Sequence, residues 1–169
     1  MGLDQFLLKR KKTNKTAEKE FENMEYEEWK NSKVAQWRKS NQVHKWFVDT
    51  IQDGNDDCGY YKVSKEKLQG LITLCKTILN ETSLIDGDVI SGFIFNEQGE
   101  KIPQIMKGKV IDKPEICRDL LPTQEGFFFG SIDYDEYYYE DIKYTYETLN
   151  EVLANTDWDN EELYYSSSW

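Results

Sequence analysis

The stretch "DYDEYYYEDIKYTYETLNEVLA", residues 133–154, contains the clearest helical pattern of the chain and decides how the rest is interpreted. Asp133 and Glu136 have the spacing of a capping box, which predicts a helix over 134–154 with Asp133 as its cap. Apolar and small side chains recur every three or four residues and predict a buried stripe of Tyr138, Ile142, Thr145, Leu149 and Val152. The opposite, solvated face carries Glu136, Glu140, Glu147 and Glu151.

The residues just before this helix predict a sharp corner. "GFFFG", residues 126–130, has the composition of a strand, so we expect Phe127 to Phe129 to form a buried strand. Where strand gives way to helix, the corner presents Thr123, Gln124, Ser131 and Tyr134. A helix N-terminus after a glycine turn favours an anion, although Asp133, Asp135 and Glu136 already occupy this one.

An earlier segment, "SKVAQWRKSNQVHKWFVDTIQD", predicts a helix over 32–52 with Ser32 as its cap. Its seam places two polar residues, Asn41 and His44, in an otherwise apolar stripe. Buried polar groups need partners, so these two side chains are either hydrogen-bonded in the core or face a ligand pocket. The seam consists of Val34, Trp37, Asn41, His44, Val48 and Ile51, flanked by Arg38 and Lys45.

The remaining elements complete an α+β protein. Ser64 caps a further helix with a plain core face, Leu68, Leu71, Ile72, Cys75, Ile78 and Leu79. Strands are expected at 3–8, at "YYKV" and at the terminal "ELYYSSSW", with a hairpin turning at "NEQGE" and Pro103 marking an edge strand. We therefore expect three main helices on a small antiparallel or mixed sheet of four to six short strands.

The chain length fits one domain over 1–169. Within it, 13–31 and 82–116 are expected to be variable excursions, the first mobile or forming a short exposed helix that Phe21, Met24 and Trp29 hold down. The three cysteines are too few and too scattered for a disulfide framework, and Cys75 belongs to a core face. No apolar run is long enough for a membrane span and no signal peptide is recognisable, so we expect a cytoplasmic protein.

The net charge of −11 is unevenly distributed. Residues 119–169 carry 13 acids and a single lysine, whereas acids and bases nearly balance over 1–118. Such a charge repels bulk DNA and RNA. It indicates either a surface that keeps the chain soluble or one that imitates nucleic acid to occupy a basic partner.

Motifs of common catalytic classes are missing from the sequence. There is no phosphate-binding loop, dinucleotide fingerprint, zinc-protease motif or nucleophile elbow. The pattern Asp53, Asn55, Asp57 begins like a calcium loop, but Cys58 and Ser64 stand where glycine and glutamate are needed. We expect no catalytic residue, metal or cofactor, and favour a binding protein over an enzyme without excluding the enzyme.

Aromatic rings beside arginine and hydrogen-bonding groups are a common way to hold a nucleotide. The predicted ligand-binding set joins one face of the 32–52 helix to the corner, although each aromatic in it has core packing as its alternative role. The set is Trp37, Arg38, Asn41, His44, Lys45, Thr123, Gln124, Ser131 and Tyr134.

Several segments together resemble an uncharacterised family of small proteins encoded by phages and prophages. The resemblance rests on "MGLDQFLL", "WRKSNQVHKWFV", "DDCGYYKVSKEKL", "LLPTQEGFFFGSIDYDEYYYEDIK" and "YYSSSW", about half of the chain. It implies a viral setting and no particular activity. In that setting we expect a counter-defence protein that sequesters a nucleotide-derived immune signal. One alternative is an acidic inhibitor that binds a host defence protein, either as a mimic of nucleic acid or in another way. The other alternative is a nucleotide-degrading enzyme. Self-association is a further expectation, because aromatic residues favour interfaces.

Overall fold

The structure, a computed structural model, describes residues 2–169 and is an α+β fold with six helices and two antiparallel sheets in that range. The elements in chain order are β1 (Asp4–Lys11), α1 (Ala17–Phe21), α2 (Tyr26–Ser32), β2 (Lys33–Arg38), α3 (Asn41–Ile51), β3 (Tyr61–Val63), α4 (Lys65–Glu81), β4 (Leu84–Phe95), β5 (Lys101–Ile111), α5 (Pro114–Leu120), α6 (Glu136–Ala154) and β6 (Glu161–Ser168).

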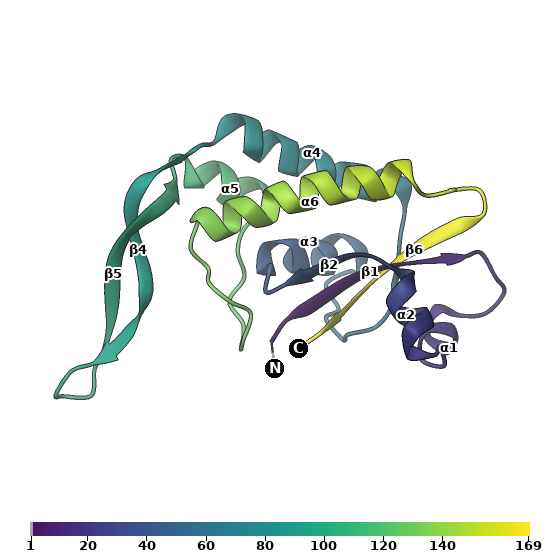
Figure 1. Ribbon diagram of the computed structural model, residues 1–169, viewed down its shortest axis with the longest axis horizontal. Coiled ribbons are helices and arrows are strands. Elements are labelled where there is room, and N and C mark those ends of the chain that lie inside the picture. Colours follow the sequence, from purple (N-terminus) through teal and green to yellow (C-terminus); the bar gives the residue numbers. More distant parts are fainter. Residues whose placement is uncertain (1) are drawn as a thin grey trace.

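The main sheet has the strand order β2-β1-β6-β3, and every neighbouring pair is antiparallel. The predicted terminal strand is therefore an inner strand, which explains why two of its serines, Ser166 and Ser167, are buried. Because β1 and β6 pair along their whole length, Asp4 lies opposite Ser168. The start of β1 and the end of β6 therefore lie together at one edge of the body (Figure 1).

The predicted helix over 32–52 is correct only in its second half. Residues 33–38 form β2, in which Ala35 and Trp37 are buried and Gln36 and Arg38 are exposed. This two-residue alternation matches the pairing of β2 with β1. Lys39, with φ of 59°, then turns the chain into α3. The helical seam that joined Val34 and Trp37 to Asn41 was wrong, because long-range pairing overrode an ambiguous local pattern.

Helices α4 and α6 lie side by side over one face of the main sheet, with α3 beneath them (Figure 1). The predicted stripe of α6 is confirmed, since Tyr138, Ile142, Thr145, Leu149 and Val152 are all buried. Ser64 caps α4 by accepting a hydrogen bond from the Lys67 amide at 3.2 Å, as predicted. α3, α4 and α6 are the three longest helices, and α1, α2 and α5 are short additions. Every helix in the described range is too short or too polar to cross a membrane.

The other face of the sheet is covered by the segment that was expected to be an excursion. Residues 17–32 form α1 and α2, and Phe21 is buried, with its ring stacked on Tyr60 at 5.0 Å and edge-on to Tyr164. Trp29 packs edge-on against Phe6. Aromatic contacts therefore hold this segment on the sheet, as the sequence suggested for Phe21 and Trp29.

The predicted hairpin is confirmed and forms a second sheet of its own, which corrects the expectation of a single sheet. β4 and β5 extend away from the rest of the molecule as a twisted ribbon, here named the arm (residues 84–111) (Figure 1). Because the ribbon has two strands, both are edge strands, in agreement with Pro103 in β5.

Candidate functional site

The segment "GFFFG" is a turn and not the predicted buried strand. Phe127 is 83% exposed, and Phe128 is exposed with a φ of 65°, a left-handed conformation outside the β region. Only Phe129 is buried, and its ring lies edge-on to His44 at 5.4 Å and to Trp169 at 5.9 Å. A composition favouring strands was overridden because no neighbouring strand is available for pairing.

Asn41 holds this turn in place. Its Nδ2 donates to the carbonyl oxygens of Phe129 at 3.1 Å and Ser131 at 2.8 Å, and its Oδ1 accepts from the amide of Gln124 at 3.0 Å. The side chain is buried and its hydrogen-bonding capacity is used by the protein itself. The sequence left two roles open for Asn41, hydrogen bonding in the core or facing a ligand pocket, and the structure shows the hydrogen bonds in the core.

His44 is also a satisfied core residue. It is fully buried, its Nδ1 lies 2.8 Å from the hydroxyl of Tyr165, and its Nε2 lies 3.0 Å from the Asp56 carboxylate. Asp56 in turn accepts from the indole of Trp169 at 3.1 Å. Burial raises the pKa of Tyr165 well above its ordinary value, so its hydroxyl stays protonated. This network ties α3 to the last strand.

Four more of the predicted residues have structural contacts within the protein. Trp37 is buried, and its indole donates to the Thr145 hydroxyl on α6 at 2.9 Å. Lys45 forms an ion pair with Asp49 one turn later on α3. The amide of Thr123 donates to the Tyr134 hydroxyl at 3.2 Å, so the two ends of the corner bind each other.

The helix after the corner begins two residues later than predicted. Asp135, not Asp133, is the cap of α6, and its carboxylate accepts from the Tyr138 amide at 3.1 Å. Asp133 instead bonds the hydroxyl of Ser131 at 3.1 Å. The sequence has an aspartate at both 133 and 135. Asp135 is the cap because its carboxylate lies against the amides of the first turn of α6.

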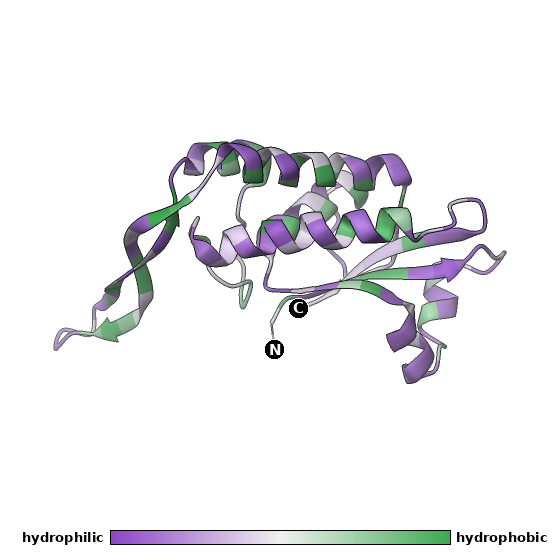
Figure 2. Ribbon diagram, turned by 45° about the horizontal axis from the view of Figure 1, so that its top comes forward, coloured by the Kyte–Doolittle hydropathy of each residue, from purple (hydrophilic) through white to green (hydrophobic). Residues whose placement is uncertain are grey.

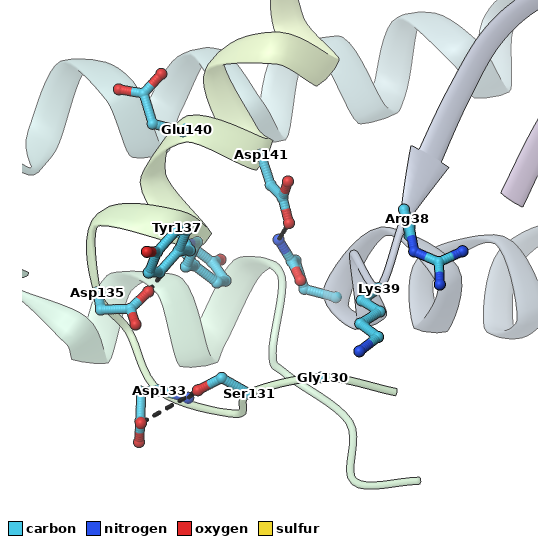
Figure 3. A pocket seen from close by; sticks show the side chains of 11 residues that line it. Arg38, Lys39, Gly130, Ser131, Asp133, Asp135, Tyr137, Glu140 and Asp141 are labelled. Atoms are coloured by element: carbon cyan, nitrogen blue, oxygen red, sulfur yellow. Dashed lines mark hydrogen bonds between the residues drawn. The ribbon is translucent and has the colours of Figure 1, made fainter. Parts of the chain in front are cut away.

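A pocket of about 420 Å³ opens between the turn that leads into α3, the loop 130–135 and the first turns of α6 (Figure 3). Two of the predicted residues, Arg38 and Ser131, line it. Thr123 and Tyr134 line a neighbouring hollow near the arm, whereas Trp37, Asn41, His44, Lys45 and Gln124 line neither. The full lining of this pocket, here named the loop pocket, is Arg38, Lys39, Gln42, Gly130, Ser131, Asp133, Asp135, Tyr137, Tyr138, Glu140 and Asp141.

A close backbone approach shapes one wall of the loop pocket. Gly130 has a φ of 94°, and a Cβ atom there would lie 3.0 Å from the Cβ of Lys39 and 3.2 Å from its carbonyl oxygen. Only glycine fits this conformation next to that neighbour without strain. Figure 3 shows the Lys39 side chain beside Gly130, with the carboxylates of α6 on the other side of the pocket.

The electrostatics of the loop pocket are mixed, with acids in excess. Arg38 already pairs with Asp4 at 2.7 Å, which leaves Lys39 as the other basic group facing Asp133, Asp135, Glu140 and Asp141. Burial raises the pKa of Asp141, opposed by hydrogen bonds that include one from Gln42. Burial also raises the pKa of Asp135. A ligand with several phosphates would meet repulsion here, while hydrogen-bonding or cationic groups would not.

Nine of the eleven residues that line the loop pocket were outside the predicted ligand set, among them Lys39, Gln42, Tyr137 and Asp141. Tyr137 is 80% exposed although it lies next to the buried Tyr138. The helical pattern could have indicated this exposure, because Tyr137 lies 100° around the helix from Tyr138 in the apolar stripe. Lys39 and Gln42 gave no signal, because the sequence pattern placed them inside a helix.

Comparison with protein-family models, with curated proteins and with solved structures finds no match, so the chemistry of the molecule carries the functional argument.

Proposed function

We propose that this chain is a non-catalytic binding protein, and that the exposed acidic face of α6 binds a basic surface on another protein. In the viral setting implied by the sequence resemblance, that partner is a host defence protein and binding inhibits it. One observation carries the proposal, namely that most of the acids between Asp119 and Asp159 are exposed and none of them forms an ion pair in the described residues.

The distribution of ion pairs along the chain supports this assignment. Several acids outside this range form ion pairs, such as Glu162 with Arg10 at 2.8 Å and with Lys62 at 2.7 Å, and Asp4 with Arg38. Between Asp119 and Asp159 no acid forms an ion pair in the described part of the chain. Like charges gathered with only one counter-charge among them, Lys143, cost stability, and a basic partner would offset that cost.

The spacing of the charges favours a protein contact over imitation of a DNA duplex. At about 1.5 Å per residue, Glu136 to Glu151 spans roughly 22 Å, so the four glutamates lie about 7 Å apart on average. Double-stranded DNA carries about one charge per 1.7 Å. The face is therefore several times less dense than a duplex, but dense enough for salt-sensitive pairing with a few lysines or arginines.

The test reverses charges on α6 and compares them with an equal change elsewhere. Glu140→Lys/Glu147→Lys alters the proposed face, and Glu25→Lys/Glu28→Lys alters exposed acids next to and on α2 with the same change of net charge. Each tagged protein is crosslinked in lysates of cells whose phage defence the wild-type chain relieves, at low and at high salt. Crosslinked peptides are then identified by mass spectrometry.

We expect the wild type and the α2 control to crosslink one host protein through a basic surface, and high salt to weaken that contact. The α6 variant should lose the crosslink and the relief of defence together. A partner retained equally by the α6 variant would contradict the proposal.

Sequestration of a nucleotide-derived signal is the second candidate. The loop pocket favours it by bringing Arg38 and Ser131 together beside the exposed ring of Tyr137, which is free to stack on a base. The four carboxylates in the same pocket disfavour phosphate, and for that reason this candidate ranks second.

Small molecules released on denaturation of protein purified from defence-active cells test this candidate. Arg38→Ala and Tyr137→Ala should abolish release, while Lys45→Ala, which lies outside the loop pocket, should not. An intact nucleotide would support sequestration, and an altered one would point to the nucleotide-degrading alternative. No released nucleotide in any signalling background would remove this candidate and leave the first one standing.

A further inference from the structure

The loop pocket contains a buried hydrogen-bond acceptor that the protein leaves unused. Gln42 lines the pocket although only 3% of it is exposed, and its Nε2 donates to a carboxylate oxygen of Asp141 at 3.3 Å. Because an ionised carboxylate only accepts hydrogen bonds, the amide nitrogen faces Asp141 and the Oε1 of Gln42 points away from it. This oxygen accepts from no donor among the described residues and remains open to solvent. A donor from outside the molecule would satisfy it.

Asp141 provides a second acceptor beside this one. It is partly buried on α6 and forms no ion pair within the described part of the chain. Burial raises the pKa of its carboxyl despite the hydrogen bond from Gln42, because the charged form has lost part of its water. A cation with hydrogen-bond donors would take the place of that water and stabilise the charged form. The two acceptors together therefore suit a positively charged group with several donors.

The other charges of the loop pocket also favour a cation. Three further carboxylates line it, those of Asp133, Asp135 and Glu140. Of the two bases, Arg38 is already held by Asp4 through two hydrogen bonds, at 2.7 and 2.9 Å. Lys39 lies beside Gly130, across the pocket from the carboxylates of α6 (Figure 3). Four carboxylates thus outnumber two bases, and the pocket attracts positive charge.

An aromatic ring at the pocket selects the kind of cation. Tyr137 is 80% exposed, so the face of its ring is open to a planar group. The guanidinium of arginine is planar, carries its donors in a fixed fork and stacks on aromatic rings, whereas the ammonium of lysine is a strongly hydrated point charge. The volume of about 420 Å³ lies near the lower end of the range of ligand sites, which suits a single side chain.

The loop pocket adjoins the surface to which the proposed function assigns a basic partner. Glu140 belongs to both, since it lines the pocket and lies on the exposed acidic face of α6. A basic protein surface that lies along α6 therefore brings its side chains within reach of the pocket. Arginine is one of the residues most enriched among the anchors of protein interfaces, which occupy well-packed pockets.

We propose that the loop pocket receives one arginine side chain of the partner protein, whose guanidinium binds the Asp141 carboxylate and the Oε1 of Gln42 and stacks on Tyr137. This inference rests on the proposed function, because it names a residue that the basic partner contributes. The acids along α6 attract the partner, and the pocket discriminates arginine from lysine.

Blocked amino acids test the pocket in the absence of any partner. N-acetylarginine methylamide and N-acetyllysine methylamide are titrated into the purified, isotope-labelled protein, and the amide resonances are followed by NMR. We expect the arginine compound to bind at least about fivefold more tightly than the lysine compound and to shift the resonances of Gln42 and Tyr137. Equal binding of the two compounds, or binding without a change at Gln42, would overturn the inference.

Three variants test the assigned contacts. Asp141→Asn and Tyr137→Ala should each weaken arginine binding about fivefold or more, because they remove the charge and the ring. Lys39→Gln should strengthen it, because it removes a like charge from the pocket. Glu28→Gln, at an exposed position on α2, changes the net charge as Asp141→Asn does and should have no effect. Circular dichroism checks that each variant is folded. Unchanged arginine binding by folded Asp141→Asn contradicts the proposed site.

Guanosine separates an arginine site from a nucleobase site. Guanine presents a planar row of donors similar to that of a guanidinium but carries no charge, so it should bind the loop pocket more weakly than the arginine compound. Tighter binding of guanosine would overturn the assignment to arginine and support the sequestration of a nucleotide instead.

Crosslinking in lysates separates this inference from the proposed function. Asp141→Asn should lower the yield of the crosslink to the host protein, and Glu28→Gln should not. If the α6 charge reversal abolishes the crosslink while purified wild type shows no preference for arginine, the acidic face stands and the arginine site is overturned. If the wild type prefers arginine while the α6 variant retains the crosslink, the role of the acidic face is contradicted and the arginine site stands.

Discussion

At the scale of the residue, polar side chains that attract attention in the sequence turn out to hold the fold together. Asn41 bonds three backbone groups of the loop before α6, and His44 bridges Tyr165 and Asp56. Arg10 does the same on the other face of the sheet, where it bonds Glu162, Glu20 and Tyr164. Such networks are worth more to stability than to ligand binding, since every donor already has a partner.

Asn41→Ala should lower the free energy of unfolding by at least about 1–3 kcal/mol, because it leaves buried backbone groups without partners. Urea denaturation measures the loss. Asn150→Ala is the control, since Asn150 is exposed and bonds only the carbonyl of Tyr146. An effect of the same size in both variants would show that Asn41 does not hold the loop.

Asp141→Asn should stabilise the protein at neutral pH. Burial raises the folded-state pKa of Asp141 above its ordinary value of 3.8, so the folded state binds more protons than the unfolded state between the two values. Stability therefore falls as pH rises through that window, and the deficit persists at pH 7. Asparagine carries no charge and can still accept from Gln42.

Thermal unfolding at pH 7 and at pH 3.5 checks this sign. The midpoint of the Asn variant should exceed that of the wild type at pH 7, and the difference should shrink at pH 3.5. Asp119→Asn, at an exposed position, should show no such pH-dependent gain. A variant that is less stable at pH 7 would mean that the ionised carboxylate is a favourable partner.

At the scale of the element, the arm shows how glycine permits a tightly twisted ribbon. A Cβ on Gly108 would lie 2.7 Å from a methyl carbon of Val89, and one on Gly87 would lie 2.5 Å from a methyl carbon of Val110. Val89 and Val110 thus occupy, on the opposite strand, the space in which Gly108 and Gly87 have no side chain. Helix α4 differs, because its Gly70 faces open space.

Gly108→Ala should loosen the arm without unfolding the body. The added methyl group forces Val89 to move, and the arm has few other contacts to compensate. Hydrogen exchange should accelerate roughly tenfold or more over 84–111 and remain unchanged in α6. Gly70→Ala, as the control, should stabilise α4 by about 0.5–1 kcal/mol. Equal acceleration across the whole chain would show that the arm does not open independently.

At the scale of the whole molecule, the distribution of charge is the dominant feature. The chain carries a net charge of −11, and the excess of acids over bases lies in residues 119–169, which include α6 and its flanking loops. Repulsion among them opposes the compact state. Salt shortens the range of this repulsion, from about 30 Å at 0.01 M to about 10 Å at 0.1 M.

The melting temperature should therefore rise by a few degrees between 10 and 100 mM NaCl. The rise should be smaller in Glu140→Lys/Glu147→Lys, in which the repulsion is already reduced, and differential scanning calorimetry measures both. A melting temperature that stays constant or falls with salt would indicate that the acids are neutralised in a way that the structure does not show.

The sequence by itself determined the elements whose pattern is local and unambiguous. The buried stripe of α6, the cap of α4 and the hairpin were all predicted, because side-chain periodicity and turn chemistry act over a few residues. The α+β class followed from them. The exposed acidic face of α6 was predicted as well, since it is the complement of the stripe.

The tertiary structure alone decided the rest. Residues 33–38 became a strand because β1 offers a pairing edge, and 127–129 became a turn that Asn41 holds through the carbonyl oxygen of Phe129. Long-range contacts likewise bury Asn41, His44 and Trp37 with hydrogen-bond partners from other parts of the chain, and they gather Lys39, Tyr137 and Asp141 around the loop pocket. Contacts between groups about 90 residues apart in the sequence depend on long-range strand pairing and on burial. A local sequence pattern contains no information on strand pairing or burial over that distance.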